Sequence, residues 1–203
     1  MLLAIANVFS LTYNSISALI SSYGYFAIFA LLVLESASLP IPSEVVLPLV
    51  GYFSRLGKLN VELSFFAGML GGLVGIAIDY YIAYFLGKDI FYKHIGLFHI
   101  RKESLDAFDD WFKRNGSFTV FIARLLPVVR GLISFPAGFA LMPQKKFYAY
   151  SLAGTAIWDI ALIAFGYYAL SVKNIYFVFT AIAAFGVMLY LIYRIATKRM
   201  NAK

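Results

Sequence analysis

The stretch that most restricts the fold of this chain is apolar but carries two arginines, two prolines and two glycines. Residues 121–138 read FIARLLPVVRGLISFPAG, and Arg124 and Arg130 lie six residues apart within them. A charged side chain at the centre of a bilayer costs about 2.5–3.5 kcal/mol, so such residues usually face a cavity or a partner. Broken backbone at membrane depth is tolerated only where protein covers it or water reaches it. The stretch therefore predicts a polar site built into a membrane protein.

Composition supports a membrane protein. The chain is 62% hydrophobic and 13% charged, and its mean hydropathy is +0.82, well outside the range of soluble domains. Its 203 residues leave room for a single membrane domain, which we assign to residues 1–203. The absence of cysteine excludes thiolate metal sites, and the two histidines, His94 and His99, fall in a polar connecting stretch. We therefore expect no metal site and no organic cofactor.

The net charge of +7 predicts topology and not a nucleic-acid partner. Basic residues cluster in residues 88–114, at Lys145 and Lys146, and in the tail after residue 193. Cytoplasmic loops of membrane proteins carry such an excess of lysine and arginine. We therefore expect these segments and the C-terminus to be cytoplasmic, in a multi-pass protein of the cell membrane.

Long apolar runs predict the membrane-crossing helices. Residues 64–87, 147–170 and 174–193 are each about long enough to cross a bilayer. In the first of them, glycines recur at four-residue spacing, which lets another helix approach closely. The polar segment 89–116 has its aromatic residues on one helical face and its charges opposite, which predicts an amphipathic helix on the membrane surface. Residues 171–203 then form a C-terminal transmembrane helix with a basic tail.

A second broken segment, residues 35–44, follows the uncharged run from Ile16 to Leu34. An apolar segment that breaks on prolines and returns through a second apolar segment indicates a re-entrant hairpin, although two ordinary helices with a short loop remain an alternative. With a cytoplasmic C-terminus, residues 117–142 enter from the cytoplasmic side and residues 35–44 from the opposite side. This arrangement resembles the inverted repeats of secondary transporters. The expected helix-breaking residues are Pro40, Pro42, Pro127, Pro136 and Gly138.

The charged residues of the two broken segments form the candidate site. A break at Pro127 would let Arg124 and Arg130 converge, and arginine forks onto phosphate or carboxylate. Glu35 and Glu44 can pair with these arginines or take up protons. Asp79 and Asp159, both inside predicted spans, are accessory candidates, and a helix-packing hydrogen bond is a simpler role for the first. A buried ion-pair network that only holds two hairpins together is the structural alternative.

The same residues argue against an enzyme. The serines of the broken segments lack a histidine in the membrane part that could act as a base. An intramembrane hydrolase would need two facing carboxyl groups, which are usually aspartates, whereas the acids here are glutamates beside prolines. We therefore expect no catalytic residues.

Together these motifs resemble the DedA family, also called SNARE-associated or VTT-domain proteins, over roughly residues 25–170. The resemblance implies two facing re-entrant hairpins in an inverted repeat and a lipid-translocating role, with bacterial members linked to returning undecaprenyl phosphate across the cytoplasmic membrane and eukaryotic relatives to phospholipid scrambling. Some members are also associated with proton-dependent membrane homeostasis. One departure is Ile78, where many members have glycine. The residues that carry the resemblance are Glu35, Pro40, Ile41, Pro42, Ser43, Glu44, Gly68 to Gly75, Asp79, Tyr84, Gly87, Phe121, Arg124, Pro127, Arg130, Ala137, Gly138, Met142, Phe147, Gly154 and Trp158.

The expected function is a transporter or flippase for a phosphate-headed lipid, with a polyisoprenyl phosphate of the undecaprenyl type favoured. Arg124 and Arg130 would hold the phosphate, while Glu35 and Glu44 would pair with the arginines in the empty site or couple movement to protons. A proton-coupled transporter of a small ion or solute and a non-selective phospholipid scramblase are the alternatives. The partners implied are membrane lipid and protons, and the sequence allows a homo-oligomer.

Overall fold

A computed structural model describes residues 2–94, 112, 115–127 and 129–168, and every regular element in these ranges is a helix. For residues 2–10 and 87–94 the structure describes the backbone and not the side chains. Residues 115–124 are also helical, ahead of the second break. The helices are α1 (Leu2–Ser36), α2 (Ser43–Arg55), α3 (Val61–His94), α5 (Val129–Leu132), α6 (Ser134–Phe139) and α7 (Gln144–Tyr168).

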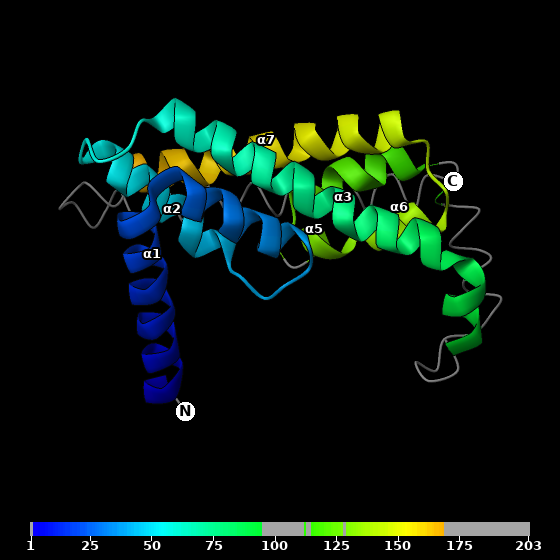
Figure 1. The fold of residues 1–203 in the computed structure, drawn as a ribbon, viewed down its shortest axis with the longest axis horizontal. Helices are drawn as coiled ribbons and strands as arrows, with labels where there is room; N and C mark the ends of the chain where they lie inside the picture. The colour runs from blue at the N-terminus through cyan, green and yellow to red at the C-terminus, as the bar shows by residue number, and fades with distance from the viewer. Residues whose placement is uncertain (1, 95–111, 113–114, 128, 169–203) are drawn as a thin grey trace.

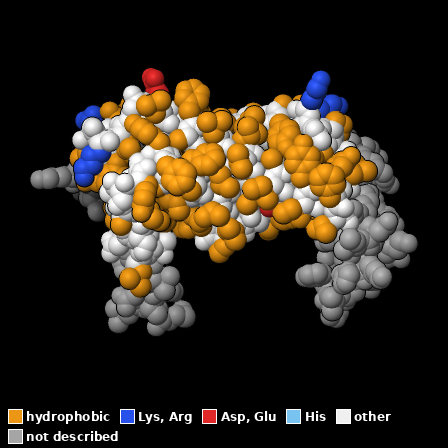
Figure 2. Space-filling model, in the orientation of Figure 1, with side chains coloured by type: hydrophobic (Ala, Val, Ile, Leu, Met, Phe, Trp, Pro, Cys, Tyr) orange, Lys and Arg blue, Asp and Glu red, His pale blue; other side chains and the backbone are white. Residues whose placement is uncertain are grey.

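Two long apolar helices, α3 and α7, run along the longest axis of the molecule (Figure 1). Val61–Leu86 and Gln144–Tyr168 are each long and apolar enough to cross a membrane. They confirm the spans expected at residues 64–87 and 147–170 as far as Tyr168. The span expected at residues 174–193 lies outside the described residues. Hydrophobic side chains cover the middle of the visible face, and the lysines and arginines lie near its two ends (Figure 2).

The predicted end of the first span is wrong. The helix was expected to stop near Gly87, with a separate surface helix over residues 89–116, but α3 continues without a break to His94. The polar residues after Gly87 do not interrupt the backbone hydrogen bonding of a helix, as a proline would. Residues 95–111 of the expected surface helix lie outside the described residues.

Helix α1 is bent, which the sequence analysis did not predict. Leu11–Ser36 is long and apolar enough to cross a membrane. Gly24, however, has φ 54° and ψ −127°, a conformation that only glycine adopts readily. The residues before the bend, which we call the arm, run steeply away from the long axis, while residues 25–36 lie along it (Figure 1). The part after the bend spans only about 18 Å, less than the thickness of a bilayer core.

Helix α2 is also too short to cross a bilayer on its own. Its 13 residues span about 20 Å. It packs against α7 with almost no space between the two backbones: a Cβ atom built on Gly51 would lie 2.1 Å from the carbonyl oxygen of Ile163, and one on Gly166 would lie 1.9 Å from that of Pro48. The re-entrant hairpin expected for the α1–α2 pair and its alternative, two ordinary helices, both stay predictions, because Leu11–Ser36 of α1 is by itself long and apolar enough to cross a membrane.

The second broken segment is a chain of short helices. Residues 115–124 are followed by turns around Pro127, then by α5 and α6. Proline removes a backbone donor and clashes with the preceding turn, which accounts for the end of the helix at Arg124. Gly138 of α6 lies against α3, where a Cβ atom would be 2.6 Å from the carbonyl oxygen of Tyr80. Gly154 of α7 lies against residues 115–124 in a similar way, 2.9 Å from the carbonyl oxygen of Phe121.

The expected close approach at the glycines of α3 is confirmed for one of the two pairs. A Cβ atom on Gly71 would lie 2.4 Å from the carbonyl oxygen of Phe29, and one on Gly75 would lie 2.4 Å from that of Val33. These two glycines therefore hold the backbone of α1 against α3. The other pair, Gly68 and Gly72, lies near side chains of α1 and α7 and not against a backbone.

Candidate functional site

The break between α1 and α2 places a buried carboxylate at the end of α1. Glu35 is 7% exposed, in the last turn of α1. Its Oε2 accepts a hydrogen bond from Ser36 Oγ at 3.0 Å, and its Oε1 accepts one from Ser43 Oγ, at the start of α2, at 3.3 Å. Pro40 and Pro42 lie in the turn between the two helices, so the serines on either side of this turn hold the Glu35 carboxylate in place.

Arg130 connects this carboxylate to the second broken segment and to α7. Its side chain is buried on α5, and Nε lies 3.1 Å from Glu35 Oε1. Nη2 lies 3.8 Å from Asp159 Oδ1 on α7, and the guanidinium carbon lies 5.2 Å from the ring centre of Trp158. The structure thus brings together three charged residues that the sequence named as candidates, Arg130, Glu35 and Asp159.

Arg124 is buried as well, but it bonds mainly to its own segment. Nη1 donates to the backbone carbonyl of Arg130, and Nη2 donates to Ser134 Oγ at 2.7 Å. The guanidinium carbon lies 5.9 Å from the ring centre of Phe147. Across the break at Pro127, the Arg124 side chain therefore reaches the backbone of Arg130, while convergence of the two guanidinium groups on one anion stays a prediction. Arg124 bonds within its own broken segment, to the Arg130 carbonyl and to Ser134, whereas Arg130 pairs with Glu35 at the end of α1.

Asp79 ties α3 to both broken segments. Its Oδ2 accepts a hydrogen bond from Ser38 Oγ at 2.5 Å, and the same hydroxyl lies 3.2 Å from the carbonyl oxygen of Gly131. Ser38 has a positive φ of 59° in the turn after α1. The contact agrees with the simpler role expected for Asp79, a hydrogen bond that fixes neighbouring elements.

A pocket of about 510 Å³ opens beside Arg130, between the turn after α1 and α5. Ligand pockets commonly have volumes of a few hundred cubic ångströms. Glu44 lies on this pocket but is exposed at its rim, so its expected pairing with an arginine stays a prediction. Thr12, from the arm, lies on the same pocket. The lining residues are Thr12, Glu35, Ser38, Leu39, Pro40, Ile41, Pro42, Glu44, Arg130, Gly131 and Leu132.

Several buried polar atoms of this cluster lack a hydrogen-bond partner within the part of the chain that the structure describes. They are Nη1 of Arg130, Nε of Arg124 and both carboxylate oxygens of Asp159. Two guanidinium groups thus share a buried region with three carboxyl groups, those of Glu35, Asp79 and Asp159. Free donors on a buried arginine suit an anion, and phosphate matches the fork of a guanidinium. Among the described residues, no group of three or more His, Asp or Glu could hold a metal ion.

Sequence reasoning missed the aromatic walls of the site. Phe147 and Trp158, both buried on α7, lie over the guanidinium groups of Arg124 and Arg130. Such cation–π contacts favour a positive charge and are worth about 0.5–2 kcal/mol each. Both aromatics belong to the motif that carries the family resemblance, but nothing in their spacing assigns them to particular arginines. Ser134 and Ser38 were noted only as serines without a histidine.

Comparison with known proteins supports the family resemblance. A family model described as VTT domain matches residues 41–168. Undecaprenyl phosphate transporter A of Staphylococcus aureus is 36% identical over 155 residues, which cover 74% of this chain and 76% of that protein. An alkaline phosphatase-like protein of Lactococcus lactis is 30% identical over 151 residues, 72% of this chain and 71% of that protein. Protein DedA of Escherichia coli is 26% identical over 161 residues, 75% of this chain and 73% of that protein. No solved structure matches.

Proposed function

The chain belongs to the DedA family of VTT-domain membrane proteins, and we infer from this and from its buried arginines that it translocates a phosphate-headed lipid across a membrane. A relative that covers most of this chain is named as an undecaprenyl phosphate transporter. We propose a polyisoprenyl phosphate of this type as the substrate, and a transporter and not an enzyme as the activity. The observation that carries the proposal is that Arg130 lines an open pocket and that its Nη1 has no hydrogen-bond partner within the described part of the chain.

Arg130 is the residue that we assign to the phosphate. It lines the pocket, and Nε and Nη2 already lie near two carboxylates that a phosphate would replace or rearrange. Arg124 does not line this pocket, and it holds the carbonyl of Arg130 and the Ser134 hydroxyl. Its Nε remains free for a headgroup that moves deeper into the site. Both arginines thus act on the phosphate, Arg130 first.

We propose that the two broken segments are re-entrant hairpins of an inverted repeat. The part of α1 after its bend, α2, α5 and α6 are each too short to cross a bilayer, and the two broken segments meet through the ion pair between Glu35 and Arg130. The chain divides into two halves, α1 to α3 and residues 115–168. Within each half the first helix packs on the last, α1 on α3 and residues 115–124 on α7. Between the halves, α2 packs on α7 and α6 packs on α3. A twofold axis between the halves would produce this arrangement, and alternate opening of the hairpins would move the headgroup.

Charge counting favours coupling to protons. The cluster holds two arginines and three carboxyl groups, and a bound phosphate would add one to two further negative charges. Uncompensated buried charge is costly, so headgroup binding should be accompanied by protonation of at least one carboxyl group. Glu35 touches Arg130 directly, and Glu44 lies at the pocket rim, where it can exchange protons with water.

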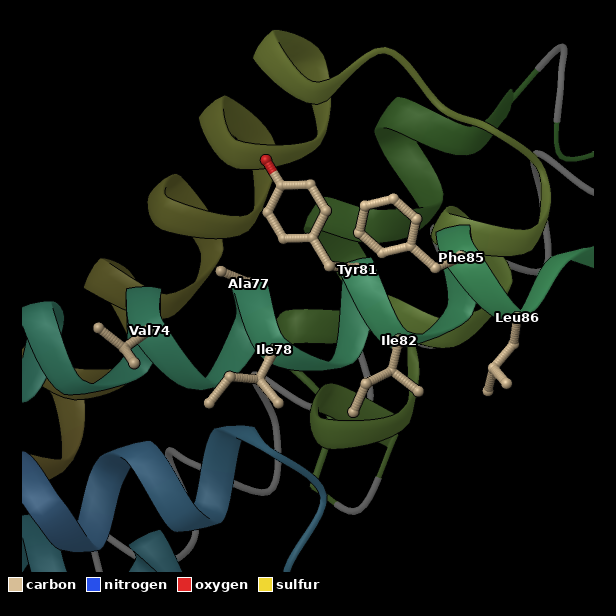
Figure 3. Close-up of a pocket in the computed structure, with 7 residues that line it drawn as sticks. All are labelled: Val74, Ala77, Ile78, Tyr81, Ile82, Phe85 and Leu86. Carbon is tan, nitrogen blue, oxygen red and sulfur yellow. The ribbon is translucent and has the colours of Figure 1, made fainter.

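The lipid tail is assigned to the exposed apolar face of α3. A shallow, open groove runs along this face, and Figure 3 shows that its residues lie on two sides of α3, Ile78 and Ile82 on one side and Tyr81 and Phe85 on the other. Ile78, which is exposed in this groove, precedes the buried Asp79 in the sequence, so the groove and the polar site lie at the same level of α3. A long isoprenoid chain can stay in contact with this surface and with the bilayer while its phosphate is held inside. The groove is lined by Val74, Ala77, Ile78, Tyr81, Ile82, Phe85 and Leu86.

The proposal is tested by lipid flux in vesicles that contain the purified full chain. We expect polyprenyl phosphate to cross faster than in protein-free vesicles, and an imposed pH gradient to change its rate. A zwitterionic phospholipid should not be accelerated. Equal acceleration of both lipids would instead identify a non-selective scramblase. Proton-dependent solute uptake without any lipid movement would identify a small-solute transporter, and either result would overturn the proposal.

A further inference from the structure

A row of buried polar side chains runs along α7 toward Arg130. Ser151, Thr155 and Asp159 are 0%, 1% and 0% exposed, respectively. None of their side-chain oxygens has a hydrogen-bond partner among the residues that the structure describes. A buried polar atom that stays unpaired costs about 1–3 kcal/mol, and ordered water commonly satisfies such atoms. Asp159 has the guanidinium of Arg130 at 3.8 Å but no hydrogen bond, and the hydroxyl groups of Ser151 and Thr155 have no hydrogen bond to the described residues, so this row of side chains is unusual.

The spacing of the row matches the reach of single water molecules. Residues four apart lie on the same helix face, with Cβ atoms about 5–6 Å apart. One water that bonds to two oxygen atoms bridges nearly the same distance, because each O–H···O contact is about 2.8 Å. A water between Ser151 and Thr155, and a second between Thr155 and Asp159, would pair all three side chains.

Two glycines of α3, Gly68 and Gly72, leave a space of about one methyl group each between this row and the side chains of α1. A Cβ atom on Gly72 would lie 3.6 Å from Thr155 Cγ2, and one on Gly68 would lie 3.8 Å from Asp159 Oδ2. These are ordinary contact distances with side chains, whereas Gly71 and Gly75 would clash with the backbone of α1. The two glycine pairs of α3 thus differ: Gly71 and Gly75 lie against the backbone of α1, whereas Gly68 and Gly72 lie between side chains of α1 and the polar row.

We propose that Ser151, Thr155 and Asp159 line a file of water molecules that carries protons between Asp159 and the end of α7 that begins at Gln144, where the buried Phe147 lies one turn before Ser151. That end of α7 carries the exposed Lys145 and Lys146. Arg124 packs closely against Gly154, next to this row on α7, and its Nε has no hydrogen-bond partner among the described residues. At its inner end the file reaches the carboxylate that faces Arg130.

The role of the file in transport rests on the proposed function. The Asp159 carboxylate lies near Arg130 of α5 and Gly68 of α3. Glu35, at the end of α1, pairs with the same Arg130 guanidinium. When a phosphate binds to Arg130, the Asp159 carboxylate loses its ion pair with that arginine. It then accepts a proton from hydronium in the file, which leaves water and a neutral carboxylic acid, and it returns that proton when the phosphate leaves. This assigns a proton site to Asp159 in addition to Glu35 and Glu44.

Water access can be measured without any transport assay. The native chain has no cysteine, so single-cysteine variants give a clean thiol signal. We would prepare Ser151→Cys and Thr155→Cys, with Ser64→Cys as the matched control. Ser64 is also fully buried, but its hydroxyl bonds to the backbone of Asn60 at 2.8 Å. The full chain in vesicles is exposed to silver ions, and the thiols that stay unreacted are counted with a maleimide after denaturation.

The file predicts that the cysteines at 151 and 155 react at least about tenfold faster than the cysteine at 64, because only a thiol in contact with water forms the reactive thiolate. Equal and slow reaction at all three positions would overturn the file, whatever the result of the lipid flux assay. Thr155→Val, which removes one hydroxyl at constant shape, should abolish the effect of a pH gradient on flux. An unchanged gradient effect in this variant, with normal lipid flux, would remove the coupling role alone.

Discussion

Replacing Arg130 with alanine is expected to lower polyprenyl-phosphate flux by about a hundredfold or more. The change removes the guanidinium that lines the pocket and leaves Glu35 and Asp159 without their cation. Truncating one partner of a buried, hydrogen-bonded charge pair costs a bound complex, here Arg130 with the phosphate, about 2–5 kcal/mol, and each 1.4 kcal/mol corresponds to a factor of ten. Flux in reconstituted vesicles, at equal amounts of folded protein, measures the effect.

Two further variants show whether the effect depends on the position and shape of the charge. Arg55→Ala removes an exposed arginine at the end of α2, which lies over the ring of Tyr167 and away from the pocket, and it should leave the flux unchanged. Arg130→Lys keeps the charge but loses the planar fork, so an intermediate flux is expected. If Arg130→Ala transports as well as Arg55→Ala, Arg130 has no part in the mechanism.

The largest effect on stability is expected for Gly166→Ala. A Cβ atom at this position would lie 1.9 Å from the carbonyl oxygen and 2.5 Å from the carbonyl carbon of Pro48. These are backbone atoms of α2, so the clash is relieved only if α2 moves away from α7. Overpacking of this kind costs about 1–3 kcal/mol, and a clash with backbone belongs at or above the upper end. Thermal unfolding in detergent should show a clearly lower Tm.

Gly72→Ala is the matched control for this prediction. The new methyl group would make ordinary contacts at 3.6 Å with Ser36 Oγ and Thr155 Cγ2, and alanine is the better helix former. Its Tm should stay close to that of the native chain. If the two variants shift the Tm by the same amount, the close contact between α2 and α7 does not support the fold.

The parts of the fold that follow from local patterns were predicted correctly. The apolar runs that became α3 and α7 are long enough to identify by length alone. The break around Pro127 follows from the chemistry of proline, and the burial of Arg124 and Arg130 follows from the apolar residues around them. The close approach at Gly71 and Gly75 follows from their spacing on one helix face.

Features that depend on the relative placement of helices were not predictable in the same way. Gly68 with Gly72 and Gly71 with Gly75 have identical spacing, yet one pair faces a row of polar side chains and the other faces a backbone. Gly24 looks like any glycine in an apolar run, and only its positive φ identifies the bend.

The sequence also did not show which acid of the site pairs with which arginine. Any of the four acids could have faced either arginine, and the positions of the helix ends decide which does. Glu35 reaches Arg130 because both lie at the inner ends of broken helices. Glu44 begins the first turn of α2 and is exposed at the pocket rim. Arg124 is turned toward the carbonyl of Arg130 and not toward an acid.

The central claim is that Arg130 holds the phosphate of a lipid inside the membrane part of the protein. The most direct measurement is the binding of a short-chain polyprenyl phosphate and of the matching polyprenyl alcohol to the purified full chain in detergent. We expect the native chain to prefer the phosphate, and Arg130→Ala to lose at least about tenfold of that preference, since a charge-assisted bidentate contact is worth more than 1.4 kcal/mol. Equal affinity of the native chain for the alcohol and the phosphate would contradict the account.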